Sequence, residues 1–266
     1  MTEQYTHGHH ESVLRSHATR TVENSAAYLI PRLRAGQEVL DVGCGPGTIT
    51  ADLAARVAPG HVLGIDNAPE ILDLARETAA ARSVTNVSFA VGDVYHLDAA
   101  DGGFDVVHAH QVLQHLTDPV AALREMRRVC RADGVVAARD SDYAAMTWYP
   151  ELPPLDRWLV LYHDVTRSNG AEADAGRRLL AWARAAGFSD VQSSASAWCF
   201  ATAAQRAWWG GTWAERVVES RIAEQAVERG LATPAELHEI AAAFMEWSAS
   251  DDAWWAVLHG EVLCTP

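Results

Sequence analysis

The stretch Val39-Leu40-Asp41-Val42-Gly43-Cys44-Gly45-Pro46-Gly47-Thr48 decides the fold of this chain. An apolar run typical of a β-strand enters it, and glycine stands at every second position from 43 to 47. An amphipathic helical pattern leaves it, because Ile49, Leu53 and Val57 recur every four residues. Glycine lets the backbone turn tightly and lets a ligand lie against the main chain. The helix start beyond it offers unpaired N–H groups, so the stretch predicts a nucleotide-type site.

Composition excludes several classes of function. The chain has 266 residues with 49% hydrophobic content, which suffices for one large core with a sub-domain. Its net charge is −14, and a chain this acidic is a poor partner for nucleic acid, whose affinity comes from phosphate contacts. Every one of the 21 basic residues is arginine. Without lysine the chain has neither a P-loop lysine nor a lysine for a Schiff base.

The expected location is cytoplasmic. No apolar run approaches the roughly 20 residues of a membrane helix, and the polar, His-rich residues 1–10 do not resemble a signal peptide. The four cysteines lack CxxC spacing, which argues against a zinc site or disulfide framework. We expect no metal at His7, His9 and His10 either, because no carboxylate or cysteine stands at ligand spacing beside them.

Between residues 36 and 140, strands alternate with helices, a pattern that predicts a parallel sheet covered on both faces. The expected strands are 38–42, 61–65, 86–91, 104–109 and 134–139. The expected helices are 47–58, 69–82 and 119–131. Pro69 and Pro119 fall at helix starts, where a missing N–H costs nothing. Residues 20–30 look helical and Pro31 should end or bend that helix, so residues 1–35 form an arm or lid before the core.

The C-terminal half breaks this rhythm. All ten tryptophans lie after residue 140, and most should form core, while a few could line an acceptor pocket. We expect a loop and helix at 141–170, a helix at 171–186 and a strand at 188–198. The core would then span 36–200, with a helical insertion at 201–255 and a last strand at 256–266. The insertion has two open roles, a cover over the acceptor or a dimer interface.

Acidic residues at strand ends sharpen the nucleotide site. Asp41 ends the first strand beside the glycines, where a ligand's amino group would suit it. Asp66 ends the second strand about 20 residues after the glycines, where an acid accepts from ribose hydroxyls. Asp93 ends the third and could accept from an adenine amino group. The fourth strand, 104–111, leads to the switch point of the sheet, where ligands bind in this architecture.

Together, the motif 41–47, Asp66, Gly92-Asp93 and the stretch 112–119 resemble class I S-adenosylmethionine-dependent methyltransferases, and most closely the quinone-biosynthesis branch. The resemblance implies a Rossmann-like, seven-stranded methyltransferase sheet of order 3-2-1-4-5-7-6, with the last strand antiparallel. It also implies S-adenosylmethionine as cofactor. The cofactor-binding residues carried over by the resemblance, with Tyr5 added from the arm, are Tyr5, Asp41, Gly43, Gly45, Gly47, Asp66, Asn67, Asp93, Val94, His110 and Gln111.

The arm from Tyr5 to Asn24 departs from the quinone branch. It is similar to arms of bacterial natural-product methyltransferases, some of which methylate indole C3 of tryptophan-derived cyclic dipeptides. If the acceptor must lose a proton, the candidate catalytic residues are His7, His9, His10, His110 and Tyr143. Asp142 is an alternative to Tyr143 beyond the fifth strand, with a surface turn as the competing interpretation. His115 is expected to be a packing or hydrogen-bonded histidine.

The leading hypothesis is methyl transfer to a small aromatic or indole-type acceptor, with C-methylation favoured. Aromatic walls suit a flat acceptor and a sulfonium. One alternative is an O-methyltransferase acting on a quinone-like or phenol-like acceptor. Two others belong to different classes, a nicotinamide oxidoreductase and a protein that binds the cofactor without transfer. Against the oxidoreductase, the glycines lack GxGxxG spacing. We expect no membrane partner, and a homodimer stays open.

Overall fold

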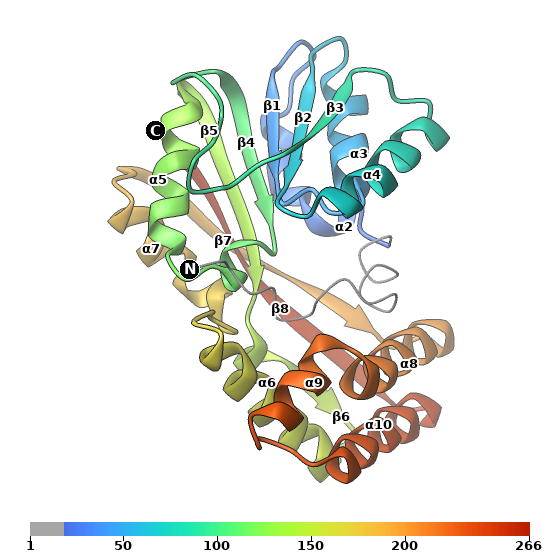
Figure 1. Cartoon of the computed structure of the whole chain (residues 1–266). Coiled ribbons are helices and arrows are strands. Elements are labelled where there is room, and N and C mark those ends of the chain that lie inside the picture. The colour runs from blue at the N-terminus through green and yellow to red at the C-terminus, as the bar shows by residue number, and fades with distance from the viewer. Residues whose placement is uncertain (1–18) are drawn as a thin grey trace.

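One mostly parallel sheet organises the chain, described here for residues 19–266 of a computed structural model (Figure 1). Within those residues it has eight strands. They are β1 (Val39–Val42), β2 (Val62–Asp66), β3 (Val87–Val91), β4 (Phe104–His110), β5 (Cys130–Ser141), β6 (Thr147–Tyr149), β7 (Asp190–Phe200) and β8 (Trp254–Thr265). The five strands expected between residues 36 and 140 all form, with β5 longer at both ends than its apolar run.

The strand order confirms the expected topology. The sheet runs β3-β2-β1-β4-β5-β8, and β7 pairs with the far side of β8. Strands β1 to β5 are parallel, whereas β8 is antiparallel to both β5 and β7. The expected strands at 188–198 and 256–266 therefore occupy the last two places. An unexpected strand, β6, pairs with the first residues of β8, which extend beyond the end of β5.

Helices cover both faces of the sheet. The helical elements are α2 (Val22–Ser25), η1 (Ala27–Arg32), α3 (Thr48–Val57), α4 (Pro69–Ala81), η2 (Leu113–His115), α5 (Pro119–Val129), η3 (Tyr143–Ala145), α6 (Pro153–Ser168), η4 (Ala175–Arg178), α7 (Leu179–Ala185), α8 (Ala203–Glu219), α9 (Arg221–Glu228) and α10 (Pro234–Ala249). Side chains alternate along β1: Val39 packs with α2, η1 and α3, while Leu40 and Val42 pack with α5 and α7. This period of two lets one strand serve two cores.

Local signals set most helix starts. Helices α4 and α5 begin at Pro69 and Pro119 as expected, and the Asp118 carboxylate accepts from the Ala121 N–H at 2.9 Å. The expected helix at 20–30 is wrong as a single element. It divides at Ala26 into α2 and a 3₁₀ helix that contains Pro31. A 3₁₀ helix tolerates this proline because its short run has few internal N–H bonds to lose.

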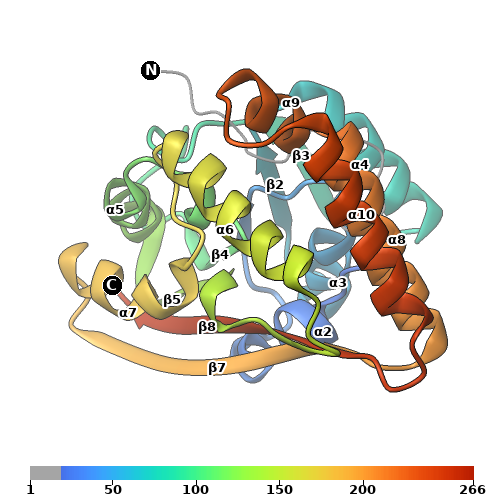
Figure 2. The same cartoon turned by 90° about the horizontal axis from the view of Figure 1, so that it is seen from below.

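The C-terminal helices form a separate aromatic layer. Strands β7 and β8 run on beyond β1–β4 and carry α6, α8, α9 and α10 at their far end (Figures 1 and 2). Trp158, Trp213, Trp247 and Trp255 are fully buried there with Phe244. The tryptophans of this half are thus mainly core, as expected, and the layer extends the sheet's C-terminal edge with an apolar body.

A search of residues 19–266 found no helix with the length and apolar content that crossing a bilayer requires.

Candidate functional site

The glycine turn between β1 and α3 has the conformation that its sequence predicts. Gly43, Gly45 and Gly47 all have positive φ, of 66°, 52° and 74°. A Cβ on Gly43 would lie 2.4 Å from Val112 Cγ2, so this position needs glycine for space as well as conformation. The Asp66 carboxylate accepts from the Gly45 N–H at 3.0 Å and from the Ala68 N–H at 3.1 Å. The end of β2 therefore fixes the turn that follows β1.

A cavity of about 160 Å³, which we call the smaller cavity, opens against this turn at the carboxyl ends of the strands. Nine of the residues expected to bind the cofactor line it: Asp41, Gly43, Gly45, Asp66, Asn67, Asp93, Val94, His110 and Gln111. Gly47 is not among the lining residues; it caps α3 and packs against Ala75. Tyr5 lies outside the described residues. Nine of the eleven residues expected to bind the cofactor thus lie around one cavity.

Two side chains of the protein interior, Thr50 and His108, hold the Asp41 carboxylate. Its carboxylate accepts from the Thr50 hydroxyl at 2.6 Å, and its other oxygen lies 2.7 Å from His108 Nδ1. Asp41 and His108 are 3% and 0% exposed. Both oxygens are therefore engaged within the protein. A ligand's amino group would share an oxygen with Thr50 or His108 instead of meeting an empty carboxylate, which is a more constrained site than the sequence suggested.

His110 is the last residue of β4 and Gln111 comes directly after it, and both line the smaller cavity. Neither ring nitrogen of buried His110 has a hydrogen-bond partner among the described residues. Burial, with help from Arg20 and Arg139, lowers the pKa of His110 well below its usual range, so the ring is neutral. Gln111 has φ of 54°, rare for a residue with a side chain. Its side chain joins Arg20 Nη2 at 2.5 Å and His259 Nε2 at 2.9 Å.

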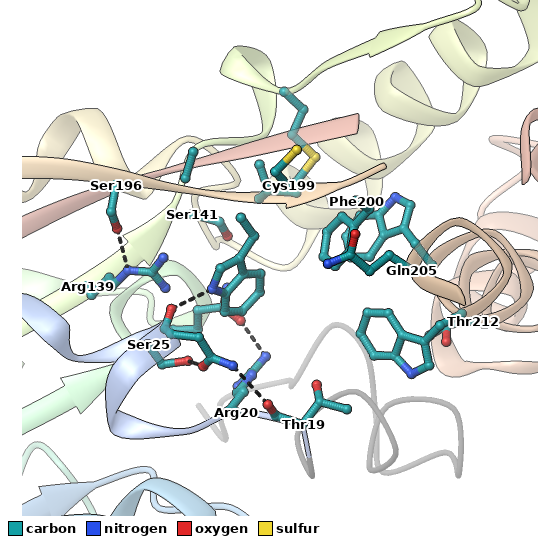
Figure 3. Close-up of a pocket in the computed structure, with 18 of the residues that line it drawn as sticks. Thr19, Arg20, Ser25, Arg139, Ser141, Ser196, Cys199, Phe200, Gln205 and Thr212 are labelled. Carbon is teal, nitrogen blue, oxygen red and sulfur yellow. Dashed lines mark hydrogen bonds between the residues drawn. The ribbon is translucent and has the colours of Figure 1, made fainter. Parts of the chain in front are cut away.

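A second cavity of about 630 Å³, the larger cavity, adjoins the first (Figure 3). Three residues line both cavities: Arg20, Gln111 and His115. Burial lowers the pKa of His115 to about 3, so this ring is also neutral. His115 was expected to be a packing histidine, and it is buried, but it also stands at the junction of the cavities. A group passing from one cavity to the other would pass these three side chains.

Aromatic rings form much of the larger cavity. Trp198 and Phe200 come from β7, and Trp208, Trp209 and Trp213 come from α8. Phe200 stacks on Trp209 with centroids 4.4 Å apart, and the Trp198 indole N–H donates to the Asn24 carbonyl at 2.7 Å. Four of the ten tryptophans therefore line this cavity, while their expected role as the wall of an acceptor pocket stays a prediction. Their planar faces leave room for a flat molecule.

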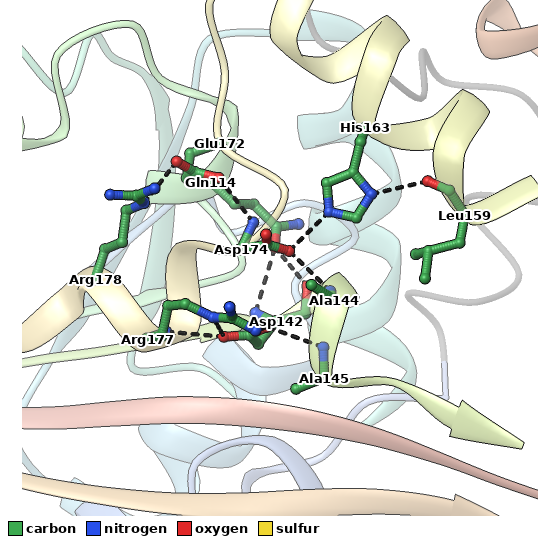
Figure 4. A network of polar contacts seen from close by, with 11 residues as sticks. Gln114, Asp142, Ala144, Ala145, Leu159, His163, Glu172, Asp174, Arg177 and Arg178 are labelled. Carbon is green, nitrogen blue, oxygen red and sulfur yellow. Dashed lines mark hydrogen bonds and ion pairs between the residues drawn. The ribbon is translucent and has the colours of Figure 1, made fainter. Parts of the chain in front are cut away.

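The catalytic candidates after β5 have different surroundings. Tyr143 lines the larger cavity but stacks on Tyr162 at 3.8 Å, and burial raises the pKa of its hydroxyl. The phenol is therefore neutral at pH 7 and is a poor proton acceptor. Asp142 is 2% exposed and forms a bidentate ion pair with Arg177, 2.6 Å on each side (Figure 4). It also accepts from the Ala145 N–H, so the Asp142 carboxylate is engaged in fixing a turn.

The adjacent pair His163 and Asp164 is not a dyad. His163 Nε2 lies 2.9 Å from Asp174 (Figure 4). Asp164 binds Arg167 instead. Neighbouring residues on a helix face different directions, so the two side chains do not meet. The remaining candidates, His7, His9 and His10, lie outside the described residues.

Sequence reasoning missed two contributors to the cavities. Arg20 lines both, yet it stands at the start of the stretch 20–30, which was expected only to be helical, so only its position before the core pointed to it. Arg139 lines the larger cavity and is 1% exposed. Its signal was the charged pair Arg139-Asp140 directly after the apolar run Val135–Ala138, since charged residues are seldom buried without a specific partner.

Comparisons with known proteins agree with this geometry. The family model of a methyltransferase domain matches residues 33–205. An uncharacterised methyltransferase of Schizosaccharomyces pombe is 37% identical over 226 residues, covering 81% of this chain and 80% of that protein. A probable methyltransferase of Aspergillus luteorubrus is 30% identical over 280 aligned positions, covering 98% of this chain and 97% of that protein.

Solved structures share the fold. Phosphoethanolamine N-methyltransferase 2 of Haemonchus contortus, with phosphomonomethylethanolamine and S-adenosylhomocysteine, is 17% identical with a TM-score of 0.57. The match covers 90% of this chain and 52% of that one. The cofactor is S-adenosylmethionine, and the alternative of a nicotinamide oxidoreductase is set aside. On the family match and the relatives' identity, the chain belongs to the class I S-adenosylmethionine-dependent methyltransferases.

Proposed function

We propose that the enzyme transfers a methyl group to a small aromatic acceptor, of indole or related type, held in the larger cavity. One observation carries this proposal: a cavity with six Trp, Phe and Tyr side chains shares three lining residues with the cavity at the glycine turn. Methyl transfer is an in-line displacement at carbon, so it needs the acceptor and the sulfonium aligned and shielded from water. Two adjoining cavities meet that need.

The cofactor would lie in the smaller cavity with its ribose at Asp66 and its adenine at Asp93 and Val94. Its methionyl end would lie near His110 and Gln111, which places the methyl group toward the junction. Support comes from the shared lining of both cavities by Gln111, Arg20 and His115. The aromatic faces beyond the junction could also stabilise the sulfonium charge before transfer.

C-methylation is favoured because His110, His115 and Tyr143, which line one cavity or both, are weak bases in their neutral forms. Burial lowers the pKa values of His110 and His115 and raises that of Tyr143. A hydroxyl acceptor would need a base to remove its proton. An electron-rich ring carbon can attack the methyl group first and lose its proton afterwards. O-methylation of a phenol-like acceptor is the alternative, with His7 or His9 as the base.

We further propose that residues 1–35 and 201–255 act as covers over the acceptor. Thr19, Arg20, Asn24 and Ser25 line the larger cavity from the N-terminal side. Helix α8 supplies the opposite wall, and α10 packs behind it through Phe244 and Gly210. These contacts support the role of an acceptor cover for both segments. A homodimer interface on the outer helices stays a separate proposal.

The test is methyl transfer from isotopically labelled cofactor to a panel of indoles, naphthols and hydroquinones, with the product's new bond assigned by NMR. We expect label on a ring carbon of at least one indole. The variant Asp66→Ala should lose transfer together with S-adenosylhomocysteine binding, because the ribose contact and the fixed glycine turn disappear. A negative panel with the cofactor bound would contradict the aromatic acceptor, and label on oxygen alone would contradict C-methylation.

A further inference from the structure

Arg139 is a buried cation in the wall of the larger cavity, and its N–H donors are not all paired with described residues. Arg139, at the end of β5, lines this cavity although its side chain is only 1% exposed. Its Nε donates to the Ser196 hydroxyl at 3.1 Å and to Glu261 at 3.3 Å (Figure 3). No described residue accepts a hydrogen bond from its Nη1. A buried donor without an acceptor costs free energy. A ligand oxygen that accepts a hydrogen bond from Arg139 would therefore bind more tightly.

The charge of Arg139 is already balanced. Glu261, on the neighbouring strand β8, is 5% exposed and pairs with Arg139 directly. Its other hydrogen bonds come from the hydroxyls of Ser194 and Ser196. A carboxylate placed at Arg139 would therefore stand beside a second buried carboxylate, and like charges at short range are unfavourable in a dry site. The free donor calls for an oxygen that is polar but neutral.

An aromatic plane lies next to this donor. The Trp198 ring centroid is 5.0 Å from the guanidinium carbon of Arg139, and Trp198 also contacts the His259 ring at 4.4 Å. An arginine stacked on an indole keeps its N–H groups in the guanidinium plane, directed away from the ring. A flat acceptor in the cavity could lie alongside this wall and direct one oxygen to the guanidinium.

We propose that the acceptor is an aromatic molecule that carries a neutral carbonyl oxygen, as in an amide, a ketone or a quinone, and that the Arg139 guanidinium donates to this oxygen. Arg139 is then a specificity-determining residue, and Glu261 sets the preference for a neutral group over an acid. This inference rests on the proposed function, since it specifies the acceptor of the same cavity.

The test uses three probes of similar shape: indole-3-acetamide, indole-3-acetate and 3-ethylindole. Their affinities are measured by calorimetry on the full chain saturated with S-adenosylhomocysteine. We expect the amide to bind on the order of tenfold or more tightly than the acetate. The acetate carboxylate would be repelled by the Glu261 carboxylate, whereas the neutral amide would not. Tighter binding of the acetate, or of 3-ethylindole alone, would overturn the proposal.

The variant Glu261→Gln gives the sharper result. It removes the buried negative charge and leaves Arg139 in place, so the ratio of acetate to amide affinity should rise by on the order of tenfold. A role limited to packing would not change this ratio. The matched control is Glu246→Gln, the same change on the exposed side of α10, which should leave the ratio unchanged. An unchanged ratio in Glu261→Gln would overturn the proposal.

The double variant Arg139→Met with Glu261→Gln removes both charges together, so no uncompensated ion is left to unfold the protein. We expect the amide to lose its affinity relative to 3-ethylindole, while S-adenosylhomocysteine binds as before. If the cofactor product binds and none of the probes does, the carbonyl proposal fails. The proposed function is judged separately, by whether any aromatic compound of the broader panel is methylated.

Discussion

At the scale of single residues, the cofactor turn depends on one close contact. Gly43 faces Val112, which begins the segment after the fourth strand, and a Cβ there would overlap Val112 Cγ2 at 2.4 Å. Because both residues line the smaller cavity, any shift that relieves this overlap also moves the wall of the site. The same glycine therefore satisfies a backbone requirement and a packing requirement.

Gly43→Ala should weaken S-adenosylhomocysteine binding by at least about tenfold, because it combines a strained left-handed residue with an overlap. Gly36→Ala is the matched control: its φ is 89°, and nothing lies within 4 Å of the added Cβ. It should cost stability without loss of affinity. Calorimetry of both variants makes the comparison, and equal affinities would contradict the role given to Val112.

Asp140 makes the folded protein sensitive to pH. Burial raises its pKa to about 7, although backbone N–H groups, among them that of Gln114 at 3.1 Å, donate to the carboxyl and oppose this rise. A raised pKa means that the folded state holds a proton that the unfolded chain releases. The stability from this proton is complete below about pH 4 and is lost as the pH rises toward 7.

The variant Asp140→Asn keeps a neutral side chain at every pH. Between pH 4 and 7, the wild-type free energy of unfolding should decline relative to this variant by up to about 1.4 kcal/mol per pH unit. Urea denaturation of both proteins at several pH values measures the difference. Parallel curves would show that Asp140 does not hold a proton in the folded state.

At the scale of elements, a few buried contacts fasten the aromatic layer to the sheet. Trp247 of α10 is fully buried, and its indole N–H donates to the Tyr149 carbonyl of β6 at 2.9 Å. Strand β6 in turn pairs with the start of β8. The short strand that sequence did not predict is thus the point where the last long helix meets the sheet.

Trp247→Phe should destabilise the protein by about 1–3 kcal/mol, since the Tyr149 carbonyl loses its donor and the smaller ring leaves space. Trp254→Phe makes the same change at a side chain that is 40% exposed, so its effect should stay within about 0.5 kcal/mol. Chemical denaturation followed by circular dichroism compares the two. A loss of the same size in both would mean that burial at α10 matters little.

The elements also show how far sequence reasoning reaches. The five parallel strands and the glycine turn were predictable because apolar runs, glycines and strand-end acids are local signals. Strand β6 was not predictable, because its three residues pair only with the part of β8 that extends beyond β5. This pairing depends on tertiary structure. The same holds for Arg20 and Arg139: their places in the cavities depend on segments far apart in the chain. The ion pair of Asp142 could not be foreseen either, because its partner, Arg177, stands 35 residues later in the chain.

At the scale of the whole molecule, the two cavities are lined largely by different parts of the chain. The family match ends at residue 205, near the start of α8, so the aromatic wall from α8 lies almost wholly outside it. The part that holds the cofactor is thus the part shared with the family. Most of the wall that would choose the acceptor on the α8 side lies beyond the matched residues.

The central claim is that the methyl group leaves the smaller cavity through the junction of Arg20, Gln111 and His115. A crystal structure of the full chain with S-adenosylhomocysteine tests it most directly. We predict that the ribose hydroxyls contact Asp66, that the adenine lies at Asp93 and Val94, and that the sulfur faces the larger cavity beside Gln111. Adenosine bound in the larger cavity, or a sulfur turned away from the junction, would contradict the account.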